Sequence, residues 1–146
     1  MQPDNLAFID ALARDMNDRP ELYERYGAAD FVAVLAMRRS ADDTFYARLF
    51  VDGVKCVAVD EIDADDAATA DFCLDGPLDA WQVMFDDIVH HGGATGLHTI
   101  NSLALMGDHI CLVGNDPMGL DKFSRFNQTL QEFFDGAARV VARTTS

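Results

Sequence analysis

Residues 44–62 read TFYARLFVDGVKCVAVDEI, and this stretch decides the fold. From Phe45 to Val51 every second residue is apolar, which places these side chains on one face of an extended strand. The Asp-Gly pair that follows favours a two-residue turn, because glycine adopts a positive φ without a steric penalty. The stretch therefore predicts a β-hairpin with strands at 44–51 and 54–62.

Three further apolar stretches extend this hairpin into a sheet. Residues 31–39 predict a strongly apolar strand and residues 67–74 a weaker one. Residues 109–114 predict a fifth strand, which lies between two glycines of the sequence. Short connections suffice for most of the pairings, so we expect a mostly antiparallel sheet.

Helical spacing of apolar residues occurs before and after these strands. It is found in four segments: 1–28, 77–91, 97–106 and 117–137. Pro77 and Pro117 suit first helical positions, and Gly92 suits a helix end. We expect residues 138–146 to form a frayed tail. The order predicts a single α+β domain over residues 1–146, with a five-stranded, mostly antiparallel sheet covered on one face by helices.

The charge balance excludes several classes of partner. The chain has 11 basic and 25 acidic side chains and a net charge of −14, which repels phosphate backbones and anionic lipid headgroups. We therefore expect no nucleic-acid binding. No apolar run approaches the ~20 residues of a membrane span, so we expect no stable membrane insertion. The N-terminal residues do not resemble a signal peptide, so we expect a cytoplasmic protein. We expect this protein to be a monomer or a homodimer.

The cysteines and histidines do not form a recognisable metal or cofactor motif. Cys56, Cys73 and Cys111 lie in apolar stretches without CxxC spacing, which predicts reduced, buried thiols. His90 and His91 are adjacent, so their side chains point about 100° apart on a helix and chelate one ion poorly. We expect neither a metal nor a cofactor.

Three stretches carry a resemblance to a known family. They are ARLFVDGVKCVAV (47–59), DFCLDGPLDAWQVMFDDIV (71–89) and SLALMGDHICLVGNDPMGLDKF (102–123). In the order of their elements and in the glycines around residues 109–114, they resemble the sterol carrier protein 2 family, over roughly residues 30–136. The resemblance implies a five-stranded sheet covered by helices, with an apolar tunnel between them that takes sterols, fatty acyl chains or similar lipids.

This resemblance and the helical spacing together suggest a ligand site. The apolar faces of the later helices are expected to line this site. Their role is to bind the ligand through shape complementarity and desolvation, and they take no part in a reaction. The expected ligand-binding residues are Trp81, Met84, Phe85, Ile88, Leu97, Ile100, Leu103, Phe123, Phe126 and Leu130. A polar group such as His98 or Asn101 is expected to orient a ligand hydroxyl or carboxylate.

The sequence favours a noncatalytic carrier of a hydrophobic small molecule or lipid, with no catalytic residues, and two alternatives stay open. One is an isomerase or hydratase that acts on a hydrophobic substrate, with His98, Asp108 and His109 as acid–base groups. It lacks the support of a nucleophile motif such as GxSxG. The other is an interaction module whose apolar groove binds a partner protein.

Overall fold

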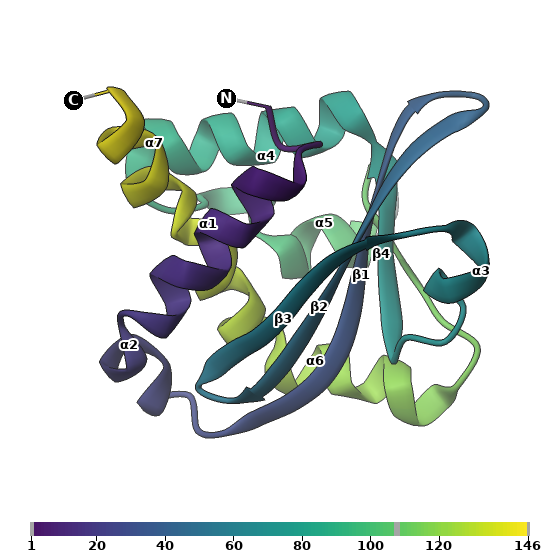
Figure 1. Ribbon diagram of the computed structural model, residues 1–146, viewed down its shortest axis with the longest axis horizontal. Coiled ribbons are helices and arrows are strands. Elements are labelled where there is room, and N and C mark those ends of the chain that lie inside the picture. Colours follow the sequence, from purple (N-terminus) through teal and green to yellow (C-terminus); the bar gives the residue numbers. More distant parts are fainter. Residues whose placement is uncertain (1, 107–108, 146) are drawn as a thin grey trace.

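The chain folds into one five-stranded sheet whose longer helices are gathered on one side (Figure 1). The computed structural model describes residues 2–106 and 109–145. The strands are β1 (Ala29–Ser40), β2 (Asp43–Gly53), β3 (Lys55–Ile62), β4 (Phe72–Pro77) and β5 (Cys111–Val113). The helices are α1 (Leu6–Asn17), α2 (Pro20–Glu24), α3 (Ala64–Ala67), α4 (Leu78–His91), η1 (Gly96–His98), α5 (Ile100–Met106), α6 (Pro117–Asp135) and α7 (Ala137–Thr145).

The sheet has the order β3-β2-β1-β4-β5. The pairs β1–β2, β2–β3 and β4–β5 are antiparallel, whereas β1 and β4 are parallel. The prediction of an α+β fold with a mostly antiparallel five-stranded sheet is therefore confirmed. A parallel pair needs a long connection, and here the chain passes through β2, β3 and α3 before it returns beside β1.

The predicted hairpin forms, but its turn lies one residue later than expected. Asp52 pairs with Lys55, so the turn residues are Gly53, with a φ of 71°, and Val54. A bulge at Val57 changes the register of β3 against β2. The side chain of Asn17 in α1 fixes this region, because its amide and carbonyl bond the backbone oxygen and nitrogen of Cys56, both at 2.9 Å.

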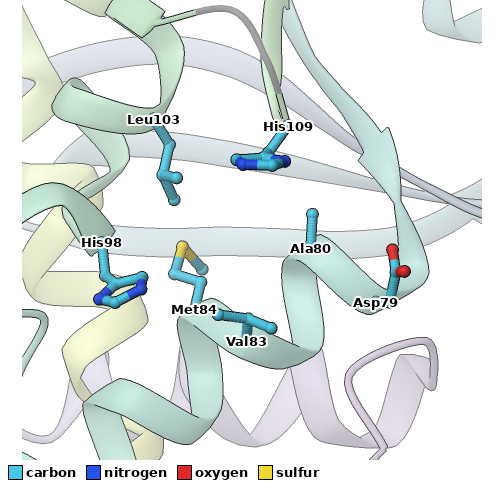
Figure 2. A pocket seen from close by; sticks show the side chains of 7 residues that line it. All are labelled: Asp79, Ala80, Val83, Met84, His98, Leu103 and His109. Carbon is cyan, nitrogen blue, oxygen red and sulfur yellow. The ribbon is translucent and has the colours of Figure 1, made fainter.

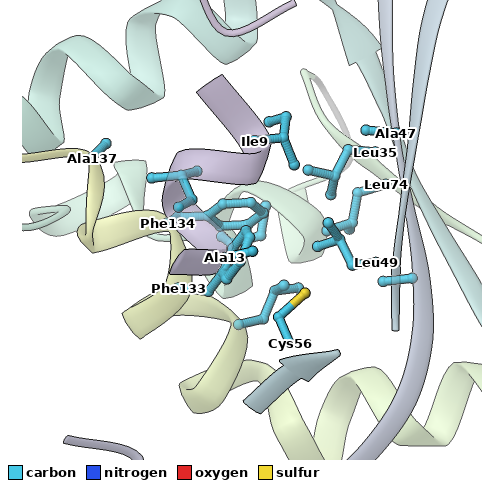
Figure 3. Close-up of a cluster of buried hydrophobic side chains, with 14 of the residues drawn as sticks. Ile9, Ala13, Leu35, Ala47, Leu49, Cys56, Leu74, Phe133, Phe134 and Ala137 are labelled. Atoms are coloured by element: carbon cyan, nitrogen blue, oxygen red, sulfur yellow. The ribbon is translucent and has the colours of Figure 1, made fainter. Parts of the chain in front are cut away.

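The core lies between the sheet and the helices. The side chains of alternate residues from Phe45 to Val51 are at most 4% exposed, as the alternation predicts. Figure 3 shows Ile9 of α1 and Phe134 of α6 meeting Leu35 of the sheet in this layer. Burial of the core side chains of α1, α4 and α6 provides the main driving force that holds the helices against the sheet.

Two stretches differ from the sequence-based expectation. Residues 67–74 are not one strand: Asp63 accepts a hydrogen bond from the Asp66 nitrogen and caps the short helix α3, and β4 begins only at Phe72. The expected frayed tail at 138–146 is helical as far as α7 extends, and Val140 is 7% exposed. Tertiary contacts that the local sequence does not show order this segment.

A buried carboxylate joins α7 to α1. The Asp15 side chain is 1% exposed, and its oxygens accept hydrogen bonds from Arg139 at 2.7 Å, Arg143 at 2.8 Å and Arg19 at 3.3 Å. Burial alone raises the pKa of Asp15, but the arginines outweigh it and hold the pKa below its usual value. Gly136 is required beside this cluster, since a Cβ there would lie 2.8 Å from Asp15 Oδ2.

Candidate functional site

A pocket of about 230 Å³ opens between α4, the segment η1–α5 and the chain just before β5 (Figure 2). Ala80, Val83, Met84 and Leu103 provide its apolar lining. Its polar lining consists of three side chains: Asp79, His98 and His109. The pocket therefore combines an apolar wall with a polar margin, which is the usual composition of a small-molecule site.

Helix α4 contributes one wall because of how its faces are divided. Pro77 precedes its first turn, and Gly92, with a φ of 79°, ends it in the left-handed conformation. The side chains of Trp81 and Phe85 are fully buried toward the core. Residues three and four positions apart share a face of a helix, so Asp79 and Val83 lie together on the exposed side of α4, whereas Ala80 packs against the core one turn before the buried Met84. Val83 is 52% exposed and lines the pocket, so it lies at the pocket margin.

Hydrogen bonds from two helices hold the opposite wall. In α4, Asp87 accepts bonds from the backbone nitrogen of Thr95 at 2.7 Å and from its hydroxyl at 2.9 Å. In α6, Asp135 accepts a bond of 3.1 Å from the Ala94 nitrogen, and Gln131 accepts one of 2.7 Å from the Ile100 nitrogen. The segment that carries His98 is thus fixed from both sides.

The position of His98 also depends on Asp87. The carboxylate oxygen Oδ1 of Asp87 lies 3.6 Å from Nδ1 of His98 and 3.0 Å from Nδ1 of His91. Burial raises the pKa of Asp87, but the two Thr95 hydrogen bonds and both histidines lower it by more, so the net shift is downward. Asp87 is therefore a charged group beside His98.

The segment before β5, which carries His109, passes very close to β4 at Gly76. The absence of a side chain at Gly76 allows this close approach. A Cβ at Gly76 would lie 2.6 Å from the carbonyl oxygen of His109 and 3.0 Å from the side chain of Ile110. Any larger residue at position 76 therefore displaces the segment before β5. The sequence suggests only a helix start at Gly76-Pro77, and the close approach is visible only in three dimensions.

The structure brings two of the expected ligand-binding residues, Met84 and Leu103, together in the pocket. The others with described side chains lie elsewhere. Trp81 and Phe85 pack against Phe134, with ring centroids 5.9 and 5.8 Å away. The remaining members are Ile88, Ile100, Phe123 and Leu130, which are at most 3% exposed, and the half-buried Phe126, which stacks on Phe31 at 5.9 Å. The side chain of Leu97 lies outside the described residues.

Of the acid–base alternatives, the pocket brings together His98 and His109. Asp108 lies outside the described residues, and Asn101 is exposed. Sequence reasoning missed Asp79, Ala80 and Val83. A signal exists for Val83, which is an apolar residue on the otherwise polar side of α4.

Other chemistries find little support in the part of the chain that the structure describes. Within residues 2–106 and 109–145, no group of three or more His, Cys, Asp or Glu side chains could hold a metal ion. Burial raises the pKa of the Cys56 thiol to about 11 and that of Cys73 to about 12, so both thiols are protonated and poorly nucleophilic at neutral pH. None of the described helices has the length and apolar character required to span a bilayer.

Comparisons with known proteins show the fold. No protein-family model matches the chain, and no curated protein matches its sequence at a significant level. The crystal structure of sterol carrier protein 2 is similar with a TM-score of 0.69 and 18% identity, over 93% of this chain and 97% of that chain. The solution structure of a conserved hypothetical protein from Thermus thermophilus, described as a possible sterol carrier protein, has a TM-score of 0.64 and 19% identity, over 94% and 91%. The chain therefore has the fold of sterol carrier protein 2.

Proposed function

We propose that the chain is a noncatalytic binding protein for a hydrophobic small molecule, a lipid or part of one, which it holds in the pocket beside α4. The apolar lining formed by Ala80, Val83, Met84 and Leu103 carries this proposal. A structural neighbour named as a sterol carrier supports it at the level of the fold.

The expected affinity follows from the apolar surface that a ligand can bury. A ligand that buries about 300 Å² gains about 7.5 kcal/mol before the cost of association. Dissociation constants in the range of about micromolar to millimolar follow from this balance. Such values suit a carrier, which must also release its ligand.

Methionine-methyl NMR tests this function directly. Met84 lines the pocket and is fully buried, and Met16 is fully buried in the core at α1, so the two methyl signals report on the pocket and on the rest of the core. We expect titration with octanol to shift the Met84 signal and leave the Met16 signal in place. Extraction of the purified protein with organic solvent, followed by mass spectrometry, identifies any natural ligand.

A pair of valine variants provides the matched control. Val83→Asp places a charge at the pocket margin and is expected to weaken octanol binding about tenfold or more. Val57→Asp makes the same change at the 62% exposed bulge of β3, at the other edge of the sheet, and is expected to leave binding unchanged. Equal binding by wild type and both variants, or no shift of Met84 with any apolar ligand, contradicts the proposed function.

The acid–base alternative stays a second candidate because His98 and His109 both line the pocket. Two imidazoles on one apolar cavity could remove and return a proton at a carbon next to a carbonyl group. Proton exchange of cyclohexanone in deuterium oxide, followed by NMR, tests this ability. Faster exchange with wild type than with His98→Ala supports it, and equal exchange with both removes His98 from the mechanism.

A further inference from the structure

We infer that the chain has a second ligand site, on the sheet face opposite the pocket beside α4, and that this site takes a small, neutral, apolar molecule. The site is a hollow of about 240 Å³ between the segment 63–71, which contains α3, the strands β2, β4 and β5, and the loop that follows β5. We call it the α3 hollow. None of the described residues that line it also lines the pocket beside α4.

The α3 hollow lies on the face of the sheet that the longer helices do not cover. Tyr46 of β2 and Cys73 of β4 line it, and both alternate along their strands with side chains that are buried in the core. They therefore point away from the core. Val113 of β5 pairs with Cys73 and lines the hollow from the same face. Figure 1 shows α3 at the right of the sheet and α1 at its left.

The segment 63–71 separates its small apolar residues from its carboxylates. Its sequence is DADDAATAD, and the hollow is lined by all of its alanines: Ala64, Ala67, Ala68 and Ala70. The carboxylates have other places, since Asp63 caps α3 and Asp71 accepts a bond of 2.7 Å from the Val32 nitrogen. Among the described residues that line the hollow, none is acidic or basic.

Hydrogen bonds hold the two sides of the hollow in place. The segment 63–71 is fixed to β1 at its end, because the Asp71 nitrogen donates a bond of 2.9 Å to the Val32 oxygen. Asn115, in the loop after β5, also lines the hollow, and its Nδ2 donates a bond of 3.4 Å to the Ala68 oxygen. The walls therefore belong to parts of the chain that the fold holds together.

Elsewhere on this face, long charged side chains cover the strands. Arg48 donates to Asp60 at 2.6 and 3.1 Å, and Arg38 donates to Asp75 at 2.6 Å. Val34, which is the neighbour of Arg48 on β1, is fully buried. The alanines of the segment 63–71 have no side chain long enough to close the hollow in the same way. The outer face therefore stays open at this place.

The lining and the volume together indicate the class of ligand. A charged group that leaves water here gains no charged partner from the lining, so a neutral molecule is favoured. Val113 is 48% exposed, and a ligand beside it would cover apolar surface that the fold leaves in water. A cavity of about 150 Å³ holds a benzene molecule. The α3 hollow, of about 240 Å³, fits a single ring with a short substituent.

Valine-methyl NMR with benzyl alcohol as the probe tests the inference. Val113 lines the α3 hollow, Val83 lines the pocket beside α4, and the 62% exposed Val57 serves as a reference for nonspecific contact. We expect benzyl alcohol, at concentrations of about 1 mM and above, to shift the Val113 signals in a saturable way and to leave the Val57 signals in place. The Val113 shift should persist in Val83→Asp, because the two sites lie on opposite faces of the sheet.

Alanine variants test whether the space in the hollow is what binds the probe. Ala67→Leu fills part of the hollow and is expected to weaken binding at Val113 about fivefold or more. Ala64→Leu makes the same change at a more exposed position of the lining, so it provides a second test with less effect on folding. Ala41→Leu, in the exposed turn between β1 and β2, is the matched control and is expected to leave binding unchanged.

The outcomes separate this inference from the proposed function. The second site is overturned if Val113 shows no saturable shift, if Val57 shifts equally, or if both lining variants bind as wild type does. Loss of the Val113 shift in Val83→Asp would also overturn it, because a single site would then produce both responses. The Met84 signal reports the pocket beside α4 independently, so either site can fail while the other stands.

Discussion

Nε1 of Trp81 in α4 donates a hydrogen bond of 3.0 Å to the carbonyl oxygen of Ala36 in β1. Trp81 is fully buried, and its neighbour Ala80 lines the pocket. The bond therefore fastens the helix that forms one pocket wall to the central strand of the sheet. The same residue that looks like a ligand contact in the sequence acts in the structure as an anchor.

The first prediction concerns this anchor. Trp81→Phe removes the indole donor and part of the buried volume, and leaves the Ala36 oxygen without this partner. We expect a loss of about 2–3 kcal/mol in the free energy of unfolding, measured by urea denaturation. Val113→Ala, at a 48% exposed valine of β5, is the control and should change stability far less. A Trp81→Phe protein as stable as wild type contradicts the assignment.

The second prediction concerns the buried carboxylate of α1. Asp15→Asn leaves Arg139 and Arg143 without their charged partner, and we expect the free energy of unfolding to fall by about 3 kcal/mol near pH 7. Asp10→Asn is the matched control in the same helix, because the exposed Asp10–Arg14 pair is worth at most about 1 kcal/mol. Similar losses in the two variants would contradict the role of burial.

The same carboxylate gives the third prediction, a pH dependence of stability. The pKa of Asp15 is lowered in the folded protein, although burial alone would raise it, because three arginines favour the charged form. The folded state therefore binds this proton less readily than the unfolded state. The stabilisation from Asp15 is present above the unfolded pKa and is lost as the pH falls through the folded pKa. Urea denaturation should show the gap between wild type and Asp15→Asn narrowing on acidification below about pH 4.

The fourth prediction concerns a buried hydroxyl without a partner. Tyr23 is 1% exposed, and its hydroxyl makes no hydrogen bond within the described residues. Tyr23→Phe should therefore keep the stability of wild type or raise it by up to about 1 kcal/mol, measured as thermal and urea midpoints. The control is Tyr26→Phe, which removes the 2.8 Å bond from Arg25 to the Tyr26 hydroxyl. A clear loss in Tyr23→Phe would show that the hydroxyl has a partner in solution.

The fifth prediction uses the close approach at Gly76. Gly76→Ala forces the backbone at His109 to move, because the new Cβ would meet its carbonyl oxygen. We expect octanol binding to weaken several-fold, with circular dichroism of the helices retained. NMR of the Met84 methyl and the histidine rings reports both effects. Unchanged chemical shifts at His109 would rule out the displacement.

Local patterns account for much of the fold but not for its register. The alternation from Phe45 to Val51 identifies β2 and its buried face, because the period of a strand is two residues. The turn lies one residue later than the Asp-Gly pair predicts, and Asn17, 39 positions away in the sequence, bonds the backbone of Cys56 beside the bulge at Val57. No local signal reports such a contact.

The pocket was harder to predict than the fold. The sequence shows an apolar stripe on α4 but does not show which of its residues face the core and which face a cavity. It therefore could not distinguish Trp81, which is a core residue, from Met84, which lines the pocket. The difference arises from where η1 and α5 lie, and that is set by distant bonds to Asp87, Asp135 and Gln131. The two histidines could be proposed as acid–base groups from the sequence, because imidazole is the side chain suited to proton transfer near neutral pH.

The parallel pairing of β1 with β4 has a consequence for how the chain acquires its structure. During synthesis, residues 29–62 can form the β1-β2-β3 meander as soon as they emerge, since their contacts are close in sequence. The unpaired edge of β1 then remains exposed until residues 72–77 are synthesised, and until then it can pair with another chain. A slow stretch of codons between these segments prolongs the exposure of this edge and should lower the soluble yield of the protein.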